Sequence, residues 1–346
     1  MTDLAASTLP FLDTLASARS GFLTTVFNIL TYLGDEKLFV VIALIVLWCF
    51  SKRGGLYMLT VGFSASSVGQ TLKMLFRIPR PWNLKDGAFG EADPVAKDGW
   101  SGDSGLGKIL SKLGDGADGW SFPSGHTIIS VGTYGGMAAW FRNKWVKILG
   151  ILLAALIPFT RLYLGVHTVV DIIGGALLSL ILVLALRPVF ASDGCGKIRA
   201  ALAGNIILTA AMLGVAYLTR PESLAGEDIR NYASGIKNLW QLLGATLAVW
   251  LAFEFDENWL HYPTKAVWWA QLLKIAGGCV IVLGLQMGIQ KALGYDSHSL
   301  NLSNMTRMGG VACLANFVAL TGGIVLWPAT FGWFSRLGYK GRHAAQ

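Results

Sequence analysis

The sequence predicts an all-α fold, a polytopic membrane bundle of about nine transmembrane helices. Its 346 residues are 53% hydrophobic and only 14% charged, whereas about 25% of the residues in a typical soluble domain are charged. The mean hydropathy is +0.53. Long apolar segments recur along the chain, and the short loops between several of them carry Lys and Arg, which is the pattern of membrane-spanning helices.

The first 35 residues differ from the rest of the chain. Apolar and polar side chains alternate at helical spacing over 8–33, which predicts an amphipathic helix at the membrane interface. We therefore expect an interfacial segment over 1–35, a catalytic core of five spans over 36–190 and a C-terminal bundle of about four spans over 191–346. The expected spans are 36–50, 55–77, 123–142, 145–160, 167–187, 199–218, 237–254, 266–289 and 306–330.

The basic loops predict the orientation of the bundle. When the spans alternate, most Lys and Arg residues between them fall on one side, which is the cytoplasmic side by the positive-inside rule. The 78–122 loop and the 161–167 turn then face the other side. The net charge of +8 is spread over loops and does not form one basic face, so we expect no nucleic-acid partner. Lys274, inside the eighth span, is expected to extend towards the cytoplasm.

Three short stretches carry the polar chemistry, and each lies at the end of an apolar segment. They are Lys73-x6-Arg80-Pro81, Pro123-Ser124-Gly125-His126 and Arg161-x5-His167-x3-Asp171. A phosphate monoester carries nearly two negative charges near neutral pH, so holding it requires several cations. Arg matches phosphate oxygens with a planar fork, and Lys supplies a point charge. Lys73, Arg80 and Arg161 are therefore candidate phosphate ligands.

The second stretch precedes an apolar run and is expected to form the first turn of a helix. The free N–H groups of Ser124, Gly125 and His126, with the positive end of the helix dipole, would then form an anion site. Gly125 allows the backbone to approach the anion closely.

The third stretch places His167 and Asp171 four residues apart, on one face of a predicted helix. A carboxylate at one ring nitrogen leaves the other nitrogen free to attack. His126, from a different span, is placed to protonate the leaving oxygen. These parts suffice for phosphoryl transfer without a metal. The alternative, a metal site, would require more His or carboxylate ligands, and the surrounding cations disfavour it.

Together the three stretches resemble the signature of the type-2 phosphatidic acid phosphatase superfamily, and the resemblance covers residues 73–171. That superfamily includes lipid phosphate phosphatases, sphingosine-1-phosphate phosphatases, glucose-6-phosphatase, bacterial undecaprenyl-diphosphate phosphatases and vanadium haloperoxidases. Its third motif usually opens with Ser-Arg, whereas here Thr160 precedes Arg161. A hydroxyl is kept, so we expect little effect.

The resemblance implies a role for each residue. His167 would be the nucleophile that forms a phosphohistidine, and Asp171 would orient it. His126 would be the general acid for the leaving group and then the base for water. No metal or other cofactor is implied. The residues implied to bind the phosphoryl group are Lys73, Arg80, Ser124, Gly125 and Arg161.

The local sequence at residues 75–82 and 165–171 is most similar to sphingosine-1-phosphate phosphatases. The expected substrate is a lipid phosphate of the sphingoid-base phosphate or phosphatidic acid type, within a membrane. Alternatives within the family are an undecaprenyl-diphosphate or phosphatidylglycerol-phosphate phosphatase, a glucose-6-phosphatase-like enzyme and a lipid phosphotransferase. Halide oxidation with vanadate and non-catalytic lipid binding are alternatives from other classes.

Several points stay open at this stage. A bacterial cell membrane and the endoplasmic reticulum both fit the sequence, and a homodimer is one alternative for the C-terminal spans. The Gly- and Asp-rich loop over 82–122 is either a solvated excursion or a lid. It contains a short helical candidate at 106–113.

Overall fold

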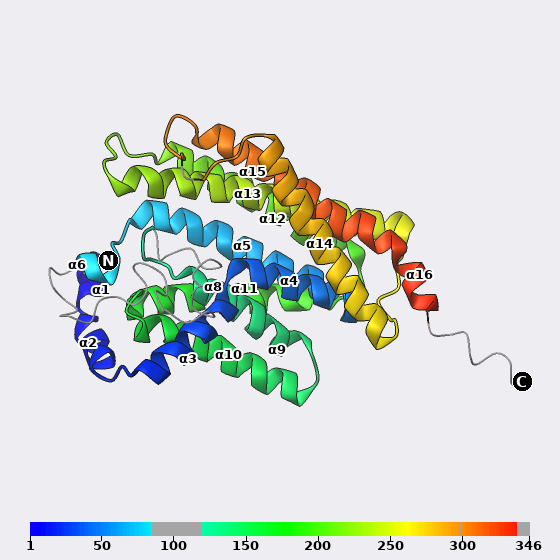
Figure 1. Ribbon diagram of the computed structural model, residues 1–346, viewed down its shortest axis with the longest axis horizontal. Helices are drawn as coiled ribbons and strands as arrows, with labels where there is room; N and C mark the ends of the chain where they lie inside the picture. The colour runs from blue at the N-terminus through cyan, green and yellow to red at the C-terminus, as the bar shows by residue number, and fades with distance from the viewer. Residues whose placement is uncertain (85–118, 298, 338–346) are drawn as a thin grey trace, which may run out of the picture.

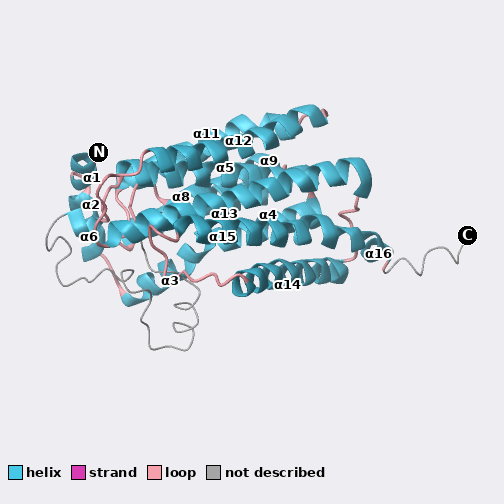
Figure 2. Ribbon diagram, turned by 90° about the horizontal axis from the view of Figure 1, so that it is seen from above, coloured by secondary structure: helices cyan, strands magenta, loops and turns pink. Residues whose placement is uncertain are grey.

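The computed structural model describes residues 1–84, 119–297 and 299–337, and all the regular secondary structure in these ranges is helical. The long helices run side by side along one axis of the molecule (Figures 1 and 2). Among the described residues, six helices are long and apolar enough to cross a membrane. The all-helical membrane fold is therefore confirmed, whereas the count of nine spans stays a prediction.

Short helices at the N-terminus precede the bundle. They are α1 (Thr2–Ala6), α2 (Leu9–Ser17), α3 (Gly21–Thr31) and the 3₁₀ turn η1 (Tyr32–Gly34). Leu9 and Leu12 of α2 are buried against Leu162, whereas Phe11 and Phe22 are exposed. The segment is thus amphipathic, as expected. Some of its apolar side chains pack against the rest of the protein, and others are exposed on the outer surface. Its placement at a membrane interface stays a prediction.

Helix α5 (Lys52–Phe76) is the central element of the fold. It follows α4 (Glu36–Ile45) and the π-helical turn η2 (Val46–Phe50). Most of its side chains are buried, because α11 and α8 pack on one side of it and α12 and α13 on the other. The helix ends at Phe76, and Arg77 adopts a left-handed conformation with φ 46°. Lys73 and Arg80 therefore do not lie on one continuous helix.

The second group of helices carries the second and third stretches. Residues 125–140 form one helical segment with a π turn in the middle, and two long helices follow it. The elements are α8 (Gly125–Ser130), η3 (Val131–Gly135), α9 (Gly136–Trp140), α10 (Lys144–Tyr163) and α11 (Val169–Phe190). Asn143 caps α10, since its side chain accepts hydrogen bonds from the amides of Trp145 and Val146.

The C-terminal half adds helices along the other side of α5. They are α12 (Cys195–Leu218), α13 (Glu227–Phe255), η4 (Asp256–Leu260), α14 (Trp268–Ala292), α15 (Met305–Thr321), η5 (Gly322–Leu326), η6 (Trp327–Thr330) and α16 (Phe331–Arg336). Two polar contacts join α12 to α5: Ser64 donates to Asn205, and the hydroxyls of Ser67 and Thr209 lie 3.0 Å apart. Such contacts satisfy polar groups inside an apolar bundle.

Lys274 of α14 does not extend into solvent. It is fully buried, and its Nζ donates to the carbonyls of Thr264 at 2.9 Å and Trp48 at 3.2 Å. The ring of Phe331 lies 4.2 Å from the same atom. Thr264 lies in the connector before α14, at the end of the bundle expected to be cytoplasmic. The side chain therefore extends in the expected direction but stays inside the protein, where carbonyls and an aromatic face satisfy the ammonium.

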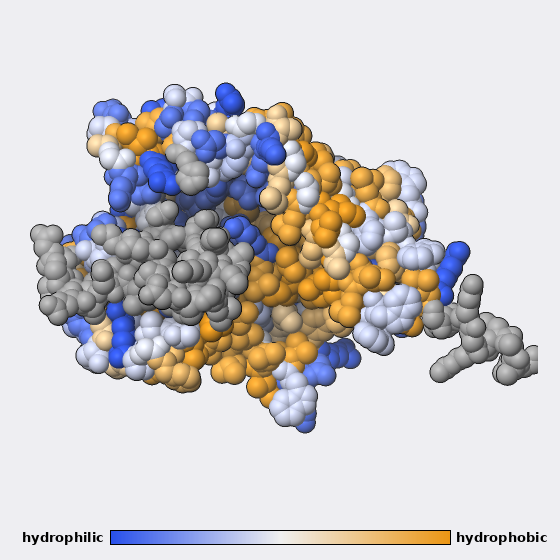
Figure 3. Space-filling view, in the orientation of Figure 1, coloured by the Kyte–Doolittle hydropathy of each residue, from blue (hydrophilic) through white to orange (hydrophobic). Residues whose placement is uncertain are grey.

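The outer surface of the bundle is rich in large apolar side chains. Hydrophobic residues predominate over the middle of the face seen in Figure 3, and hydrophilic residues gather towards its left end. Exposed apolar side chains lie on α10, α11, α12 and α14, for example Leu152, Ile181, Ile207 and Val280. Surfaces of this kind require an apolar environment, and together with the six apolar helices they indicate an integral membrane protein.

Candidate active site

The fold brings the three stretches to one end of the bundle. The first runs across the end of α5, the second starts α8, and the third runs from the last turn of α10 to the first turn of α11. In Figure 1 this end lies on the left, near α6 (Pro81–Leu84) and the N-terminal helices. His126 lies close enough to interact electrostatically with Arg161, His167, Arg80 and Lys73. The convergence expected from alternating spans is therefore present.

His167 lies just before α11, not on it. Thr168 is the N-cap of the helix, and its hydroxyl accepts the amide of Asp171 at 3.4 Å. The carboxylate of Asp171 reaches back and accepts the amide of Thr168 at 2.6 Å, which completes a capping box. The expectation that His167 and Asp171 share a helix face is wrong. They are neighbours because the cap turns the carboxylate towards the residue that precedes the helix.

Ser121 lies between the histidine and the carboxylate. Its hydroxyl donates to Oδ2 of Asp171 at 2.5 Å and lies 3.2 Å from Nδ1 of His167. The direct distance from Nδ1 of His167 to Oδ2 of Asp171 is 3.5 Å. All three side chains are buried. The serine hydroxyl is thus closer to the ring than the carboxylate is. Sequence analysis missed Ser121, since nothing in the spacing of the three stretches points to it.

Ser121 fixes the protonation of the imidazole ring. Its proton is used on Asp171, so its oxygen can only accept at Nδ1, and the proton of the neutral ring sits there. Nη1 of Arg80 lies against the ring, 2.9 Å from Nε2 and 3.5 Å from Nδ1. Nδ1–H therefore faces Ser121 and Asp171, and Nε2 keeps its lone pair. This is the tautomer that a nucleophilic Nε2 requires.

The charge state of His167 suits the same role. Burial, together with the neighbouring cations Arg80, Lys73 and Arg161, holds the pKa of His167 well below its usual range. Removing water and adding positive charge both disfavour the imidazolium form. The ring is therefore neutral at neutral pH, with a free lone pair on Nε2.

Lys73 and Arg80 also hold the chain that leads into the second stretch. Nζ of Lys73 donates to the carbonyl of Trp120 at 2.7 Å, and Nε of Arg80 donates to the carbonyl of Gly119 at 2.9 Å. Gly119 has φ +78°, a conformation that glycine adopts without strain. On its other side, Trp120 donates from Nε1 to Asp228 of α13 at 3.1 Å. The C-terminal half therefore contributes to the placement of this segment.

The second stretch forms a helix start, as expected, but its first amide is already used. The hydroxyl of Ser124 caps α8 by accepting the amide of Thr127 at 3.4 Å. The amide of Ser124 donates to the carbonyl of Asp171 at 3.1 Å, so the expectation that this amide is free is wrong. The amides of Gly125 and His126 belong to the first helical turn, which provides no intrahelical acceptor for them. Among the described residues outside its own helical turn, no atom lies within 4 Å of the Cβ position of Gly125, so these residues leave open space beside it.

Arg161 is the third cation, and it is 6% exposed. Its Nη1 donates to the hydroxyl of Thr31 at 2.8 Å. Its buried Nε has no hydrogen-bond partner among the described residues. A buried donor without a partner is costly, and an oxygen of a bound phosphoryl group would satisfy it. Thr31, at the end of α3, is a second contributor that sequence analysis missed.

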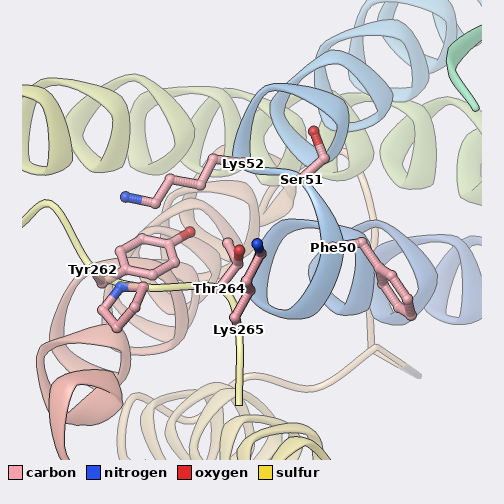
Figure 4. A pocket seen from close by; sticks show the side chains of 7 residues that line it. Phe50, Ser51, Lys52, Tyr262, Thr264 and Lys265 are labelled. Carbon is pink, nitrogen blue, oxygen red and sulfur yellow. The ribbon is translucent and has the colours of Figure 1, made fainter. Parts of the chain in front are cut away.

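A separate pocket lies at the opposite end of α5 (Figure 4). Its volume is about 480 Å³, and none of the expected site residues lines it. Lys52 in its wall is paired with Asp256 at 2.6 Å. The pocket is therefore not part of this site. Its lining consists of Phe50, Ser51, Lys52, Tyr262, Pro263, Thr264 and Lys265.

The site can bind a small anion and attack it. Three cations and two helix-start amides provide the binding charge, and a neutral imidazole in the correct tautomer provides the nucleophile. Within residues 1–84, 119–297 and 299–337, no group of three or more His, Cys, Asp or Glu side chains is placed to hold a metal ion.

The expected helical candidate at 106–113, and most of the expected loop or lid over 82–122, lie outside the described residues.

Comparison with known proteins agrees with this arrangement. An undecaprenyl-diphosphatase of Sulfolobus acidocaldarius is 44% identical over 59 residues, which are 17% of this chain and 28% of that protein. The chain thus matches little more than a quarter of that relative's length. No solved structure matches the chain. The model of the PAP2 superfamily matches residues 54–193, which include all three stretches. Residues 54–193 therefore form a PAP2 superfamily domain.

Proposed function

We propose that the protein hydrolyses a lipid phosphate in a membrane through a phosphohistidine at His167, without a metal ion. The observation that carries this proposal is the arrangement of one imidazole ring. Nδ1 of His167 faces Ser121 and Asp171, which leaves the lone pair on Nε2, and the guanidinium of Arg80 lies against the ring. Positive charge surrounds the ring, so an anionic phosphoryl group is attracted to the atom that attacks it.

Binding comes first. In the free protein, Arg80 lies against the ring of His167 and donates to the carbonyl of Val166 at 2.9 Å. A phosphoryl oxygen is a stronger acceptor than this carbonyl, because it is charged. Arg80 therefore turns its fork to the phosphate when substrate binds, and this uncovers Nε2. Nε of Arg161 and the amides of Gly125 and His126 supply further donors.

The first chemical step transfers the phosphoryl group. Nε2 of His167 forms a bond to phosphorus as the bond from phosphorus to the lipid oxygen breaks. His126 takes up a proton when the dianionic phosphate binds beside it and gives that proton to the leaving oxygen, and the lipid alcohol leaves. The phosphorylated ring then carries a positive charge with its proton on Nδ1, and the carboxylate of Asp171, linked through Ser121, stabilises it.

The second chemical step releases phosphate. His126, now neutral, takes a proton from water, and the water oxygen bonds to phosphorus. The phosphorus–nitrogen bond breaks, and its electron pair returns to Nε2 of His167. Inorganic phosphate leaves, and both histidines are again in their starting states.

The lipid nature of the substrate is supported by the setting of the site. The site lies at the end of a helical bundle with a broad apolar surface, so a lipid can reach it from the membrane. The sequence around Arg80 and His167 favours a sphingoid-base phosphate or phosphatidic acid. Undecaprenyl diphosphate is a second candidate, because the relative from Sulfolobus acidocaldarius is named for that activity.

A substrate panel tests the proposal. Purified protein in EDTA is given sphingosine-1-phosphate, phosphatidic acid, undecaprenyl diphosphate, phosphatidylglycerol phosphate and glucose-6-phosphate, and released phosphate is measured. We expect release from at least one lipid and none from His167→Ala. Quenching in alkaline detergent with a ³²P-labelled substrate should trap a labelled protein that is stable in base and labile in acid. Release in His167→Ala would refute the assigned nucleophile, and product that depends on an added lipid acceptor would indicate a transferase.

A further inference from the structure

The segment Thr31–Gly34 lies outside the 54–193 match, yet it touches two of the three stretches. We infer that it belongs to the active site as a positioning segment. Thr31 aims Arg161 at the phosphoryl group, and Gly34 aims His126 at the leaving oxygen. This inference rests on the proposed phosphatase function and assigns a task to a part of the chain that the family comparison does not cover.

Thr31 acts on Arg161 through one buried hydrogen bond. The bond from Nη1 to Oγ1 is 2.8 Å long, and the two residues are 6% and 7% exposed. A guanidinium is planar, so fixing one of its nitrogens and its stem fixes the direction of the others. Nε, on the far edge of the plane, has no partner among the described residues. The bond to Thr31 therefore leaves the Nε edge of the Arg161 guanidinium available to a phosphoryl oxygen.

Gly34 acts on His126 through close packing. A Cβ at position 34 would lie 3.4 Å from Cδ2 of the His126 ring, 3.3 Å from the His126 carbonyl oxygen and 2.7 Å from Cγ2 of Ile157. The backbone of Gly34 therefore forms one wall of the space that the imidazole occupies. The neighbouring Leu33 is tied to the same helical segment, since its carbonyl accepts the hydroxyl of Tyr134 at 2.8 Å.

The chain just before α3, the helix that ends at Thr31, is also bonded to the site region. Nε of Arg19 donates to the carbonyl of Tyr163 at 2.9 Å, and the amide of Ser20 donates to the hydroxyl of the same tyrosine at 3.2 Å. Tyr163 is the last residue of α10, the helix that carries Arg161. The chain before and after Thr31 is thus fixed to the site, so Thr31 and Gly34 do not have to be ordered when substrate binds.

The two contacts predict different kinetic signatures. Arg161 binds the phosphoryl group, which is the same in every substrate, so a change at Thr31 should affect all substrates alike. His126 protonates the leaving oxygen, and this matters for an alkyl alcohol but little for a phenol that is already a good leaving group. A change at Gly34 should therefore affect alkyl phosphates selectively.

The test uses full-length protein in detergent with a lipid phosphate that the wild type hydrolyses and with p-nitrophenyl phosphate. Thr31→Val should lower kcat/KM for both substrates about tenfold or more, as expected for a lost hydrogen bond to a charged group, and should weaken inhibition by inorganic phosphate. Thr31→Ser should recover most of the activity. Gly34→Ala should lower kcat/KM about tenfold for the lipid and much less for the aryl phosphate.

Two matched controls lie on α3. Thr25→Val removes a hydroxyl that bonds to the Gly21 carbonyl at 2.9 Å within the same helix. Gly21→Ala adds a Cβ at a position with no atom within 4 Å. Both should keep wild-type kinetics. Because Gly34→Ala can displace Ile157, Tyr134→Phe serves as a second variant, which frees the Leu33 carbonyl without adding volume and should show the same dependence on leaving group in weaker form.

Some outcomes would overturn the inference. Thr31→Val with wild-type kcat/KM and phosphate inhibition would remove the role of Thr31. Equal losses on both substrates in Gly34→Ala and in Tyr134→Phe, with lowered thermal unfolding temperatures, would show a purely structural role for Gly34. A wild-type protein with no phosphatase activity on any substrate would refute the proposed function itself, and the inference with it.

Discussion

The hydroxyl of Ser121 lies 3.2 Å from Nδ1 of His167 and is the closest polar side-chain group that we find at that nitrogen. The proton on Nδ1 points to the serine oxygen, and the serine proton points to Asp171. Two hydrogen bonds in series thus link the ring to the carboxylate. Bonds in such a chain strengthen one another when the local environment excludes water.

Ser121→Ala is the direct test of this relationship. The substitution removes the link while leaving both end groups in place, so the ring loses its tautomer control. We expect kcat to fall about ten- to a hundredfold, with a smaller change in KM. Ser130→Ala is a matched control, since that buried hydroxyl bonds only to the Thr127 carbonyl in its own helix. A wild-type kcat in Ser121→Ala would mean that Asp171 acts on the ring directly.

Two substitutions at Asp171 separate its structural and chemical roles. Asp171→Asn keeps an oxygen for the Thr168 amide, so the helix cap and the thermal unfolding temperature should be retained. The negative charge is lost, and kcat should fall about a hundredfold or more. Asp171→Ala also removes the acceptor of the Thr168 amide, which is half of the capping box, and should cost about 1 kcal/mol of unfolding free energy. If Asp171→Asn kept full activity, the carboxylate charge would have no part in catalysis.

The pH dependence of the reaction should show the lowered pKa of His167. Burial and the cations Arg80, Lys73 and Arg161 disfavour the charged ring, so the neutral nucleophile persists below the ordinary histidine pKa of about 6.5. The acid limb of kcat/KM assigned to His167 should therefore lie below that value. Arg80→Gln removes one positive neighbour and should shift this limb to higher pH. Comparing both proteins on the same substrate cancels the titration of the substrate. An unshifted limb would assign it to another group.

Cysteine labelling tests the expected orientation of the protein, in which the site lies on the side of the membrane opposite the cytoplasm. Glu222 lies in the loop after α12, at the end of the bundle that holds the site, and Asp193 lies in the loop before α12, at the opposite end. In a background with the four native cysteines replaced by serine, Glu222→Cys should react with a membrane-impermeant maleimide on intact cells. Asp193→Cys should react only after the membrane is permeabilised. The reverse pattern would place the site on the cytoplasmic side.

The sequence by itself determined the class of fold and the three stretches that meet at one end of the bundle. Hydropathy is a local property, so the apolar segments and their ends could be read without knowing how they pack. Alternation of the spans then placed Lys73, His126 and His167 at one end of the bundle, and the structure brings them together there. The spacing of the three stretches also indicated the PAP2 superfamily, which the comparison confirms.

Only the tertiary structure decided how the site is supported. Ser121 meets Asp171 from 50 residues away, and Thr31 meets Arg161 from 130 residues away. The Ser124 amide is used by Asp171, and Lys274 is satisfied by carbonyls from other segments. A hydrogen bond depends on ångström-scale distances and directions, and no local pattern specifies which distant group will fill a given position. The sequence therefore named the residues with chemistry, whereas packing selected the residues that hold them in place.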